Sequence, residues 1–398
     1  MIHQRSITWL AVLSAVAAAG CAAGPTASLQ EPRARPRVSI EALAKPAGIT
    51  RTSHVQVGIL PLGSVPYDNL SLPIVSPDGR FVATQTGVPP TWAALMAAPN
   101  ATVPRATRIE IYQLDRELRR AVHRSTIDEP LLLGRSCDAR GFLVESVRPN
   151  GARWIGRVAW LDGEIEWLVA DEQTNANGCL GPKGRLAWSR RARDADHFDL
   201  VVRSSGEEWT IGSQGGDWLF PAWSGHGDGL FALRLTQGML EATHMIAASP
   251  TAIHQTLRRL PLASQATIHH AYQAMASQAV VTEAQRPGPE QLMFFHPVRL
   301  RMALWRPISR HQTTPILLGE HSSAAAAVGT GFALVATEDH LMLQNLEDLS
   351  DQTEVIAGLQ VPRQVASPDW PYLLLAPAEG RIGLIALRLM PGDDGRAR

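Results

Sequence analysis

The chain has 398 residues, with 37 Lys and Arg against 37 Asp and Glu, and 45% of its residues are hydrophobic. This balance excludes a sequence-wide basic surface for nucleic acid and an acidic disordered tail. After the first twenty residues no apolar run reaches the roughly 18–20 residues that a membrane-spanning helix needs. We therefore expect a globular body with a large core, which binds no nucleic acid and does not cross a membrane.

The N-terminus predicts a signal peptide, residues 1–20. Basic residues precede an apolar stretch that is too short to span a bilayer. The small residues before Cys21 resemble the lipobox of bacterial lipoproteins, although Ala18 stands where Leu is usual. The resemblance implies that Cys21 is lipidated, and Ala22 after it favours the periplasmic face of the outer membrane. The alternative is ordinary cleavage, which would release a soluble periplasmic or secreted protein.

Composition divides the rest of the chain into three parts. Residues 21–53 are rich in Pro, Arg, Ala and Ser and have no apolar period, so we expect a flexible tether. Residues 54–390 form the folded domain, and residues 391–398 form a disordered charged tail.

The folded domain repeats a turn followed by a strand. The clearest copy is the Ser-Pro-Asp-Gly-Arg turn at 76–80, which leads into an apolar strand suited to burial on both faces. Seven copies start their strands at Phe81, Phe142, Leu186, Leu230, Val280, Phe332 and Tyr372, with steps of 61, 44, 44, 50, 52 and 40 residues. A period of roughly 40–50 residues with several short strands is typical of β-propeller blades.

We therefore predict an all-β fold, a seven-bladed β-propeller of four-stranded antiparallel blades. The first repeat is expected to continue through strands at 108–112 and 131–133. An apolar strand at 54–60 and another at 381–389 lie at the two ends of the domain, and we expect them to pair. This pairing of N- and C-terminal strands would close the ring and remove exposed sheet edges.

Residues 76–84 and 185–205 resemble the repeat of the TolB-like family of periplasmic propellers, and the pattern is also similar to WD repeats. The family repeat has a Ser-Pro-Asp-Gly turn, a strand, a polar Asp-rich turn and a second strand, in which Val201 stands where Tyr is frequent. The resemblance implies a β-propeller lipoprotein of the bacterial cell envelope that can bind a peptide of a partner lipoprotein at one face.

Two stretches exceed the repeat, residues 86–107 and 247–278. We expect short helices at 251–260 and 266–278 in the second of them. Connections of this length are uncommon unless they act as lids or binding elements, so both are candidate functional segments, with decoration as the alternative.

The polar clusters favour structural roles. Residues 194–199 (DADHFD) could bind calcium, but they lack the Gly and the distal Glu of an EF-hand loop, so we expect an inter-strand turn. His254, His269 and His270 could ligate a metal, but neighbouring histidines point in different directions, and an exposed polar insert is favoured. Around Ser224 the glycines of a nucleophile elbow are missing, and Lys183 is not followed by Ser or Thr as in a phosphate-binding loop.

The sequence leaves two alternatives for the tryptophans and two for the cysteines. Seven of the eleven tryptophans fall in the second to fourth repeats: Trp154, Trp160, Trp167, Trp188, Trp209, Trp218 and Trp223. Packing between blades is favoured for them over a platform for sugar rings, an alternative that fails if Trp154, Trp160 and Trp167 are all buried. Cys137 and Cys179 either form a disulfide or remain as two buried thiols.

The sequence thus favours a non-catalytic, monomeric, envelope-anchored scaffold. It identifies no catalytic, cofactor-binding or metal-binding residue, and we expect no cofactor. The expected partner is an envelope protein or a cell-wall component, with membrane contact through the lipid anchor only. The alternatives are a propeller enzyme with a central metal or cofactor, lactonase-like or quinoprotein-like, and a carbohydrate-binding module.

Overall fold

The computed structural model divides the chain into two compact units, Met1–Arg37 and Val38–Arg398. The residues that it describes all belong to the second unit. They are 49–51, 55–66, 73–87, 107–115, 117, 119–223, 229–236, 239–246, 253–261, 281–282, 292–296, 301–305, 316–317, 324–328, 332–337, 340–345, 350, 352–357, 364–366, 372–378 and 381–391.

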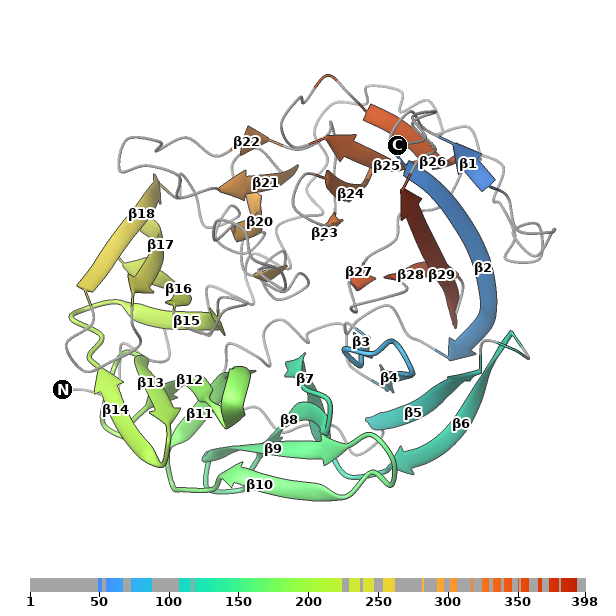
Figure 1. Cartoon of the computed structure of the whole chain (residues 1–398). Coiled ribbons are helices and arrows are strands. Elements are labelled where there is room, and N and C mark those ends of the chain that lie inside the picture. Colours follow the sequence, from blue (N-terminus) through green and yellow to red (C-terminus); the bar gives the residue numbers. More distant parts are fainter. Residues whose placement is uncertain are drawn as a thin grey trace, which may run out of the picture. The chain divides into compact units, whose positions relative to one another are not determined.

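The described residues form β-sheets (Figure 1), one short 3-10 turn, η2 (Pro182–Gly184), and no α-helix. The terminal sheet contains β1 (Ile49–Arg51), β2 (Val55–Pro66), β27 (Gln364–Ala366), β28 (Tyr372–Ala378) and β29 (Arg381–Pro391). The next sheet contains β3 (Ile74–Val75), β4 (Phe81–Thr86), β5 (Arg108–Asp115) and β6 (Arg120–Ile127).

An eight-stranded sheet follows. Its first half contains β7 (Leu131–Cys137), β8 (Gly141–Val147), β9 (Arg153–Ala159) and β10 (Ile165–Val169). Its second half contains β11 (Thr174–Leu180), β12 (Leu186–Arg191), β13 (Asp199–Ser204) and β14 (Glu207–Ile211). One parallel pair, Thr174 opposite Arg153, joins the halves, and the other pairings within them are antiparallel.

Three further four-stranded antiparallel sheets complete the described part. The first has β15 (Asp217–Trp223), β16 (Gly229–Thr236), β17 (Met239–Ile246) and β18 (Ile253–Pro261). The second has β19 (Val281–Thr282), β20 (Leu292–His296), β21 (Arg301–Trp305) and β22 (Ile316–Leu317). The third has β23 (Ala324–Val328), β24 (Phe332–Ala336), β25 (His340–Asn345) and β26 (Gln352–Ala357).

Neighbouring sheets contact one another in chain order. β2 lies against β6, β3 against β7, β11 against β15, β15 against β19, and β20 against β23, while β23 also lies against β27. Successive antiparallel sheets of about four strands are the units of a β-propeller. The all-β prediction is confirmed, and the sheets are arranged as propeller blades are.

The strands near the two ends of the domain pair with each other. β2 is antiparallel to β29 over most of its length, from Val55 opposite Pro391 to Pro66 opposite Arg381. The Arg381 guanidinium also donates to the Ser64 carbonyl oxygen at 2.7 Å. The predicted pairing of terminal strands is therefore present in the structure.

The middle strands are buried on both faces because alternate side chains enter different clusters. In β8, Phe142 and Val144 pack with the β3–β6 sheet, Phe81 included. Leu143 between them points the other way and packs with Trp188 of β12. This alternation explains why the middle strands read as continuous apolar runs in the sequence.

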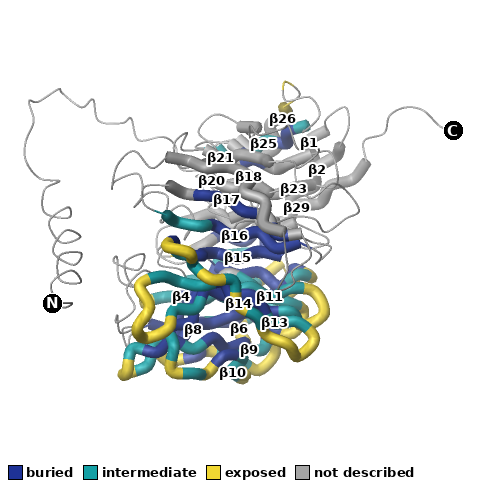
Figure 2. The backbone as a smooth tube through the Cα atoms, turned by 90° about the vertical axis from the view of Figure 1, so that its left-hand side faces the viewer, coloured by how far each residue is buried: buried dark blue, intermediate teal, exposed yellow. Residues whose placement is uncertain are grey.

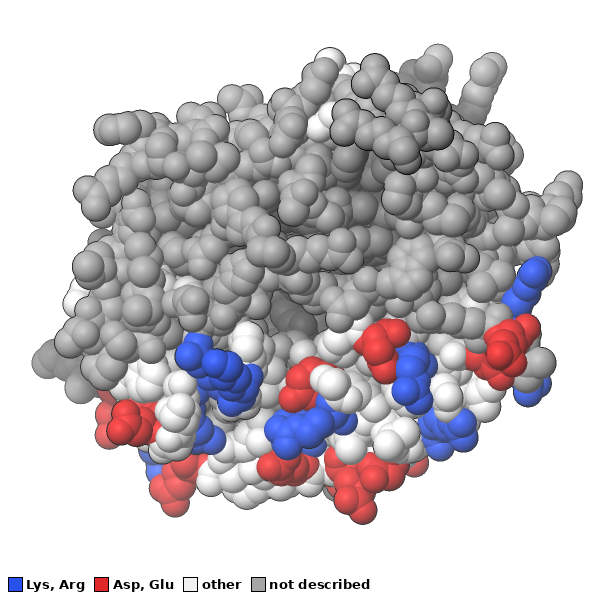
Figure 3. Space-filling view, in the orientation of Figure 1, with Lys and Arg blue, Asp and Glu red and all other residues white. Residues whose placement is uncertain are grey.

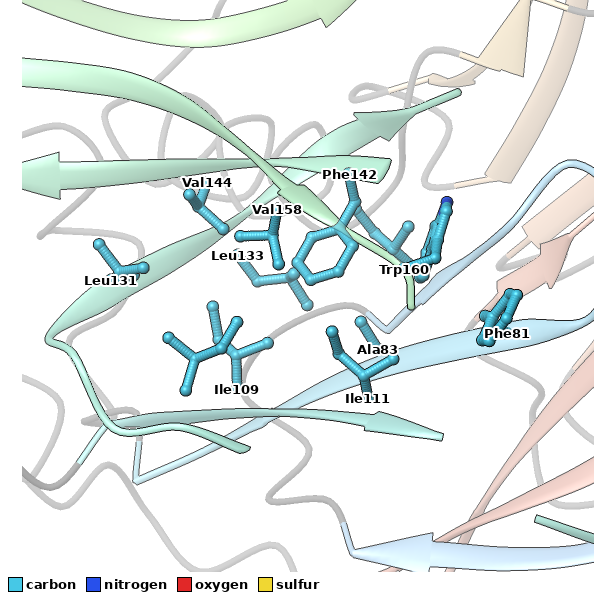
Figure 4. Packing of buried hydrophobic residues seen from close by; sticks show 12 residues of the cluster. Phe81, Ala83, Ile109, Ile111, Leu131, Leu133, Phe142, Val144, Val158 and Trp160 are labelled. Carbon is cyan, nitrogen blue, oxygen red and sulfur yellow. The ribbon is translucent and has the colours of Figure 1, made fainter. Parts of the chain in front are cut away.

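Figure 4 shows the cluster between the β3–β6 sheet and the β7–β10 half. Trp160 is buried in it, with its ring centroid 4.8 Å from Phe142 and 6.0 Å from Phe81. Figure 2 shows that exposed residues concentrate in the turns of the described part, whereas β8 and β9 are largely buried.

Gln85 is a buried polar side chain that links two sheets. From β4 its amide nitrogen donates to the Leu131 carbonyl oxygen at 2.6 Å, and its amide oxygen accepts from the Leu133 N–H at 3.1 Å. The side chain thereby supplies both hydrogen bonds that a neighbouring strand would give to β7.

Two predicted elements were wrong. Residues 131–133 were expected to complete the first repeat, but they lie in β7, the first strand of the next unit, and the polar strand β6 completes the repeat instead. Residues 251–260 were expected to be helical, whereas β18 pairs with β17 there, because tertiary pairing overrides a weak helical propensity. The helix expected at 266–278 lies outside the described residues.

Candidate functional site

The first strands of three successive units leave regular pairing at similar places. Pairing skips between Leu133 and Cys137 in β7, between Ala176 and Cys179 in β11, and between Leu219 and Ala222 in β15. Such bulges redirect side chains and are enriched beside functional sites. The three bulged strands, β7, β11 and β15, are therefore the candidate functional site.

In β11 the bulge consists of Asn177 and Gly178. Asn177 has a φ of +56°, in the left-handed region that Asn tolerates better than most residues. Its N–H donates to Oε1 of Glu145 from β8 at 2.7 Å. We call this conformation, with its hydrogen bond to Glu145, the Asn177 bulge.

A buried ion pair holds the acceptor of the Asn177 bulge. Nη1 of Arg153 lies 3.3 Å from Oε2 of Glu145, and the two side chains are 1% and 3% exposed. Removing both charges from water is costly, so the pair needs good geometry and further hydrogen bonds. Its role here is structural and specific, because Glu145 contacts the Arg153 guanidinium with one oxygen and the Asn177 backbone with the other.

Asn175 extends this network to the next strand. Its Nδ2 donates to the Arg153 carbonyl oxygen at 3.1 Å and to Oδ1 of Asp171 at 2.7 Å. Its Oδ1 accepts from Nε1 of Trp188 at 2.9 Å. The Asn177 bulge is thus supported by buried polar side chains from both halves of the eight-stranded sheet.

The bulge in β15 contains Phe220, with a φ of +49°, followed by Pro221. A bulky residue in the left-handed region is an outlier, and such strain costs of order 1–3 kcal/mol. Pro221 has no N–H to donate to a ladder, which makes regular pairing impossible at that position. Backbone strain of this kind persists only where the surrounding structure imposes it. The positive φ of Phe220 therefore supports including the β15 bulge in the candidate functional site.

Cys137 and Cys179 are both free thiols near the ends of the bulged strands. Cys137 lies opposite Phe142, the second residue of β8, and Cys179 lies opposite Ala187, the second residue of β12. The two side chains pack in different clusters. Their separate packing accounts for the absence of a disulfide. Both thiols are free, as in the second alternative that the sequence left open, and they are partly buried.

Burial controls the chemistry of both thiols. Desolvation raises the pKa of Cys137 to about 12, and its Sγ–H donates to the Val75 carbonyl oxygen at 3.2 Å. Desolvation likewise raises the pKa of Cys179, a shift that the Trp223 and Ser136 hydrogen bonds partly oppose. Neither sulfur has the thiolate character of a reactive cysteine.

Residues 194–198 of the Asp-rich segment lie in the connection between β12 and β13, as expected, and Asp199 begins β13. Asp199 accepts from the Ser213 N–H at 2.7 Å through Oδ1, and the Phe198 N–H donates to Oδ1 of Asp217 at 2.9 Å. Within the part of the chain that the structure describes, no group of three or more His, Cys, Asp or Glu side chains is placed to hold a metal ion.

The tryptophans divide between core and partial exposure. Trp160, Trp188, Trp218 and Trp223 are buried, as the packing interpretation predicts. Trp154, Trp167 and Trp209 are only half-buried. Two of the three residues that the carbohydrate interpretation requires are therefore partly exposed, and Trp160 is not.

Several sequence candidates lie outside the described residues or side chains. They are Cys21, Ser224, His269, His270, the side chain of His254, and most of the segments 86–107 and 247–278. No helix among the described residues is long and apolar enough to cross a membrane.

The sequence analysis missed the bulges, although local signals mark two of them. Asn-Gly at 177–178 favours a positive φ, and Phe-Pro at 220–221 interrupts a strand. The partners Glu145 and Arg153 carry no such signal, because only tertiary structure brings β8, β9 and β11 together.

Charge on the described surface is mixed. Figure 3 shows Lys and Arg side chains alternating with Asp and Glu side chains over the described part of this face, with no continuous patch of one sign. Elsewhere among the described residues, Arg108 and Asp128 form an exposed pair, 3.1 Å apart.

Comparison with known proteins gives structural likenesses of low identity. No family model matches the chain, and no curated protein matches it. A puromycin-hydrolysing peptidase of Mycobacterium tuberculosis is 14% identical with a TM-score of 0.46, covering 84% of this chain and 55% of its own, so the chain spans about half of that peptidase's length.

Two other solved structures are similar to most of the chain, and one of them is a β-propeller domain by name. The β-propeller domain of Myceliophteria thermophila Cps50 (Swd1) is 13% identical with a TM-score of 0.46, covering 86% of this chain and 99% of its own. A protein assigned as TolB from Agrobacterium tumefaciens is 9% identical with a TM-score of 0.37 and the same coverage, 86% and 99%. Likenesses of this size assign the chain to no family, and what these proteins bind or cleave does not carry over to it.

Proposed function

We propose that the chain is a non-catalytic, seven-bladed β-propeller, anchored to the cell envelope through lipidated Cys21, which binds an envelope protein or a cell-wall component. The blade number rests on the eight-stranded sheet, whose two four-stranded halves share only the pair Thr174 and Arg153. When the two halves are counted as separate blades, the six described sheets correspond to seven blades. Pairing of β2 with β29 supports closure of the ring.

The Asn177 bulge is the observation that carries the binding role. In a closed propeller the first strand of each blade faces the axis, so β7, β11 and β15 would contribute to one axial surface. A bulge fixed by the buried pair of Glu145 and Arg153 presents Asn177 in one conformation, which reduces the ordering cost of binding. These observations support a ligand-binding end of the propeller at the three bulges.

Affinity capture tests this proposal. Full-length wild type and Asn177→Gly would be used to capture partners from detergent-solubilised envelopes, with bound proteins and muropeptides identified by mass spectrometry. Glycine keeps the positive φ of the Asn177 bulge while removing the side-chain amide. Gln214→Gly is the matched control, because Gln214 also has a positive φ but lies in the exposed turn before β15.

The expected result is a partner enriched by wild type and Gln214→Gly and lost with Asn177→Gly. Equal capture by all three variants would place binding elsewhere. Failure of wild type to enrich any envelope component over an unrelated lipoprotein would contradict the scaffold function itself.

The anchor has a separate test. Mass measurement of the mature N-terminus should show diacylglycerol on Cys21, and Cys21→Ser should move the protein from the membrane fraction to the soluble fraction. A mature N-terminus other than Cys21 would instead support the released form.

A further inference from the structure

Arg148, Trp154 and Trp167 form a compact group on the β7–β10 half of the eight-stranded sheet. The two indole rings have centroids 5.6 Å apart and planes at 72°, so they form two walls of a corner. The Arg148 guanidinium carbon lies 3.8 Å from the Trp154 ring centroid and 4.8 Å from that of Trp167. We call these two rings the tryptophan corner.

The walls of the corner are positioned without help from Arg148. Nε1 of Trp154 donates to the Asp171 carbonyl oxygen at 2.8 Å, which fixes the orientation of that ring. Trp167 stands opposite Gly156 in the β9–β10 pair, and a Cβ on Gly156 would lie 3.0 Å from the Trp167 ring. The glycine therefore lets the indole lie directly over the β9 backbone.

Arg148 differs from the other arginines that contact tryptophan. Among the described residues its guanidinium has no ion pair and no hydrogen-bond acceptor, and its buried Nε is without a partner. Arg234 lies over Trp218 at 5.5 Å, but it donates to the Ser213 carbonyl oxygen at 2.8 Å. Arg148 is thus held in the corner by aromatic faces alone.

The unpartnered N–H indicates which cation suits the corner. Two indole faces attract positive charge through their ring quadrupoles. They offer no acceptor for an N–H, so a guanidinium or a primary ammonium loses hydrogen bonds to water when it enters. A quaternary ammonium has no N–H and loses none.

We propose that the tryptophan corner is a binding site for a quaternary ammonium group, which Arg148 occupies in the ligand-free protein and leaves when the ligand binds. The displaced Nε of Arg148 regains a hydrogen bond to water. A free choline-type cation and a phosphocholine lipid headgroup share this chemistry, and the experiment below distinguishes them. The proposal is independent of the Asn177 bulge, so either can fail without the other.

Titration with tetramethylammonium tests the site. Binding to wild type and Arg148→Ala would be followed by calorimetry and tryptophan fluorescence at constant ionic strength. If Arg148 occupies the corner about nine-tenths of the time, its removal lowers the apparent Kd about tenfold. Arg148→Met, with its apolar side chain of similar length, provides a second variant and should give an intermediate gain.

Two controls separate the site from general effects. Arg234→Ala removes an arginine from a buried tryptophan and should leave the tetramethylammonium affinity unchanged. Trp154→Leu in the Arg148→Ala background removes one wall and should abolish the gain, with thermal unfolding confirming that each variant folds.

The selectivity arm compares tetramethylammonium with methylguanidinium, and the first should bind Arg148→Ala more tightly. Phosphocholine in solution and phosphatidylcholine vesicles distinguish the two sources, since binding to the vesicles alone indicates a lipid headgroup. Equal tetramethylammonium affinity of wild type and Arg148→Ala would show that the ligand does not displace Arg148 from the corner. Tighter binding of methylguanidinium, or no binding of either cation to Arg148→Ala, would overturn the quaternary ammonium site.

Discussion

Single buried polar groups join the units of this protein. Gln85 bonds to the backbone of β7, and Glu145 bonds to the Asn177 N–H of β11 while contacting Arg153. Each of these groups satisfies a backbone donor or acceptor of a neighbouring strand that would otherwise be buried without a partner. Their loss should therefore affect the contact between units more than the strand that carries them.

The Glu145–Arg153 pair gives a prediction at this scale. Glu145→Gln should lower the free energy of unfolding by about 3–5 kcal/mol, because it removes the carboxylate charge that lies against the buried Arg153 guanidinium. Urea denaturation measures the change. Asp128→Asn is the matched control, since its exposed pair with Arg108 should contribute less than about 1 kcal/mol. Equal, small effects of both variants would show that the buried pair is not needed for folding.

The buried thiols predict a loss of stability at alkaline pH. Burial raises the pKa of Cys137 to about 12, whereas an unfolded thiol titrates near 8.5. Stability from the neutral thiol is therefore fully present below pH 8.5 and is lost as the pH rises toward 12. Between pH 8 and pH 10 the Cys137 thiol alone should account for a loss of about 2 kcal/mol.

Urea denaturation of wild type and Cys137→Ala/Cys179→Ala at several pH values checks this slope. Burial also raises the pKa of Tyr112, but that contribution is common to both proteins and cancels in the comparison. The prediction is contradicted if the double variant loses as much stability as wild type over the same range.

At the scale of the element, strands and turns follow local sequence closely. The Ser-Pro-Asp-Gly turn forms as expected, with the Arg80 N–H donating to Oδ1 of Asp78 at 3.0 Å and the Phe81 N–H donating to Oγ of Ser76 at 2.9 Å. Strand β10 covers residues 165–169, an apolar and β-prone run between two polar turns. Assignment of strands to sheets was less predictable, because residues 131–133 are apolar enough to end one repeat or to begin the next.

Gly141, the first residue of β8, gives the prediction for this scale. A Cβ at this position would lie 2.0 Å from the Val158 carbonyl oxygen on β9, so the backbone would have to move. Gly141→Ala should destabilise the protein by about 3 kcal/mol in urea denaturation, the upper end of the usual cost of overpacking. Gly212→Ala meets nothing within 4 Å and should change stability by less than about 1 kcal/mol. A Gly141→Ala protein as stable as wild type would show that β8 and β9 are farther apart.

At the scale of the whole molecule, contacts between sheets join distant parts of the chain. β2 and β29 pair across more than three hundred residues, with Val55 opposite Pro391. Pairings of such sequence separation form late and slowly, because a long loop must be closed first. They also cover the sheet edges on which aggregation begins.

Deletion of residues 381–398 tests the importance of this pairing. The deletion removes β29 and leaves edges of β2 and β28 unpaired, so the midpoint of urea denaturation should fall and hydrogen exchange in β2 and β28 should accelerate. Deletion of residues 392–398 alone is the control and should change neither quantity. Identical midpoints for the two truncations would mean that the β2–β29 pairing adds nothing to stability.

The sequence by itself determined the strand-rich class, the repeated turns and the pairing of the terminal strands. These features depend on local chemistry, namely turn residues that accept a positive φ, β-prone runs, and apolar segments at the ends of the domain. Only the tertiary structure decided that β6 completes the first repeat, that residues 253–261 are a strand, and that Glu145 supports Asn177. Those features depend on which side chains meet after distant strands pair, and no local pattern in the chain encodes such a meeting.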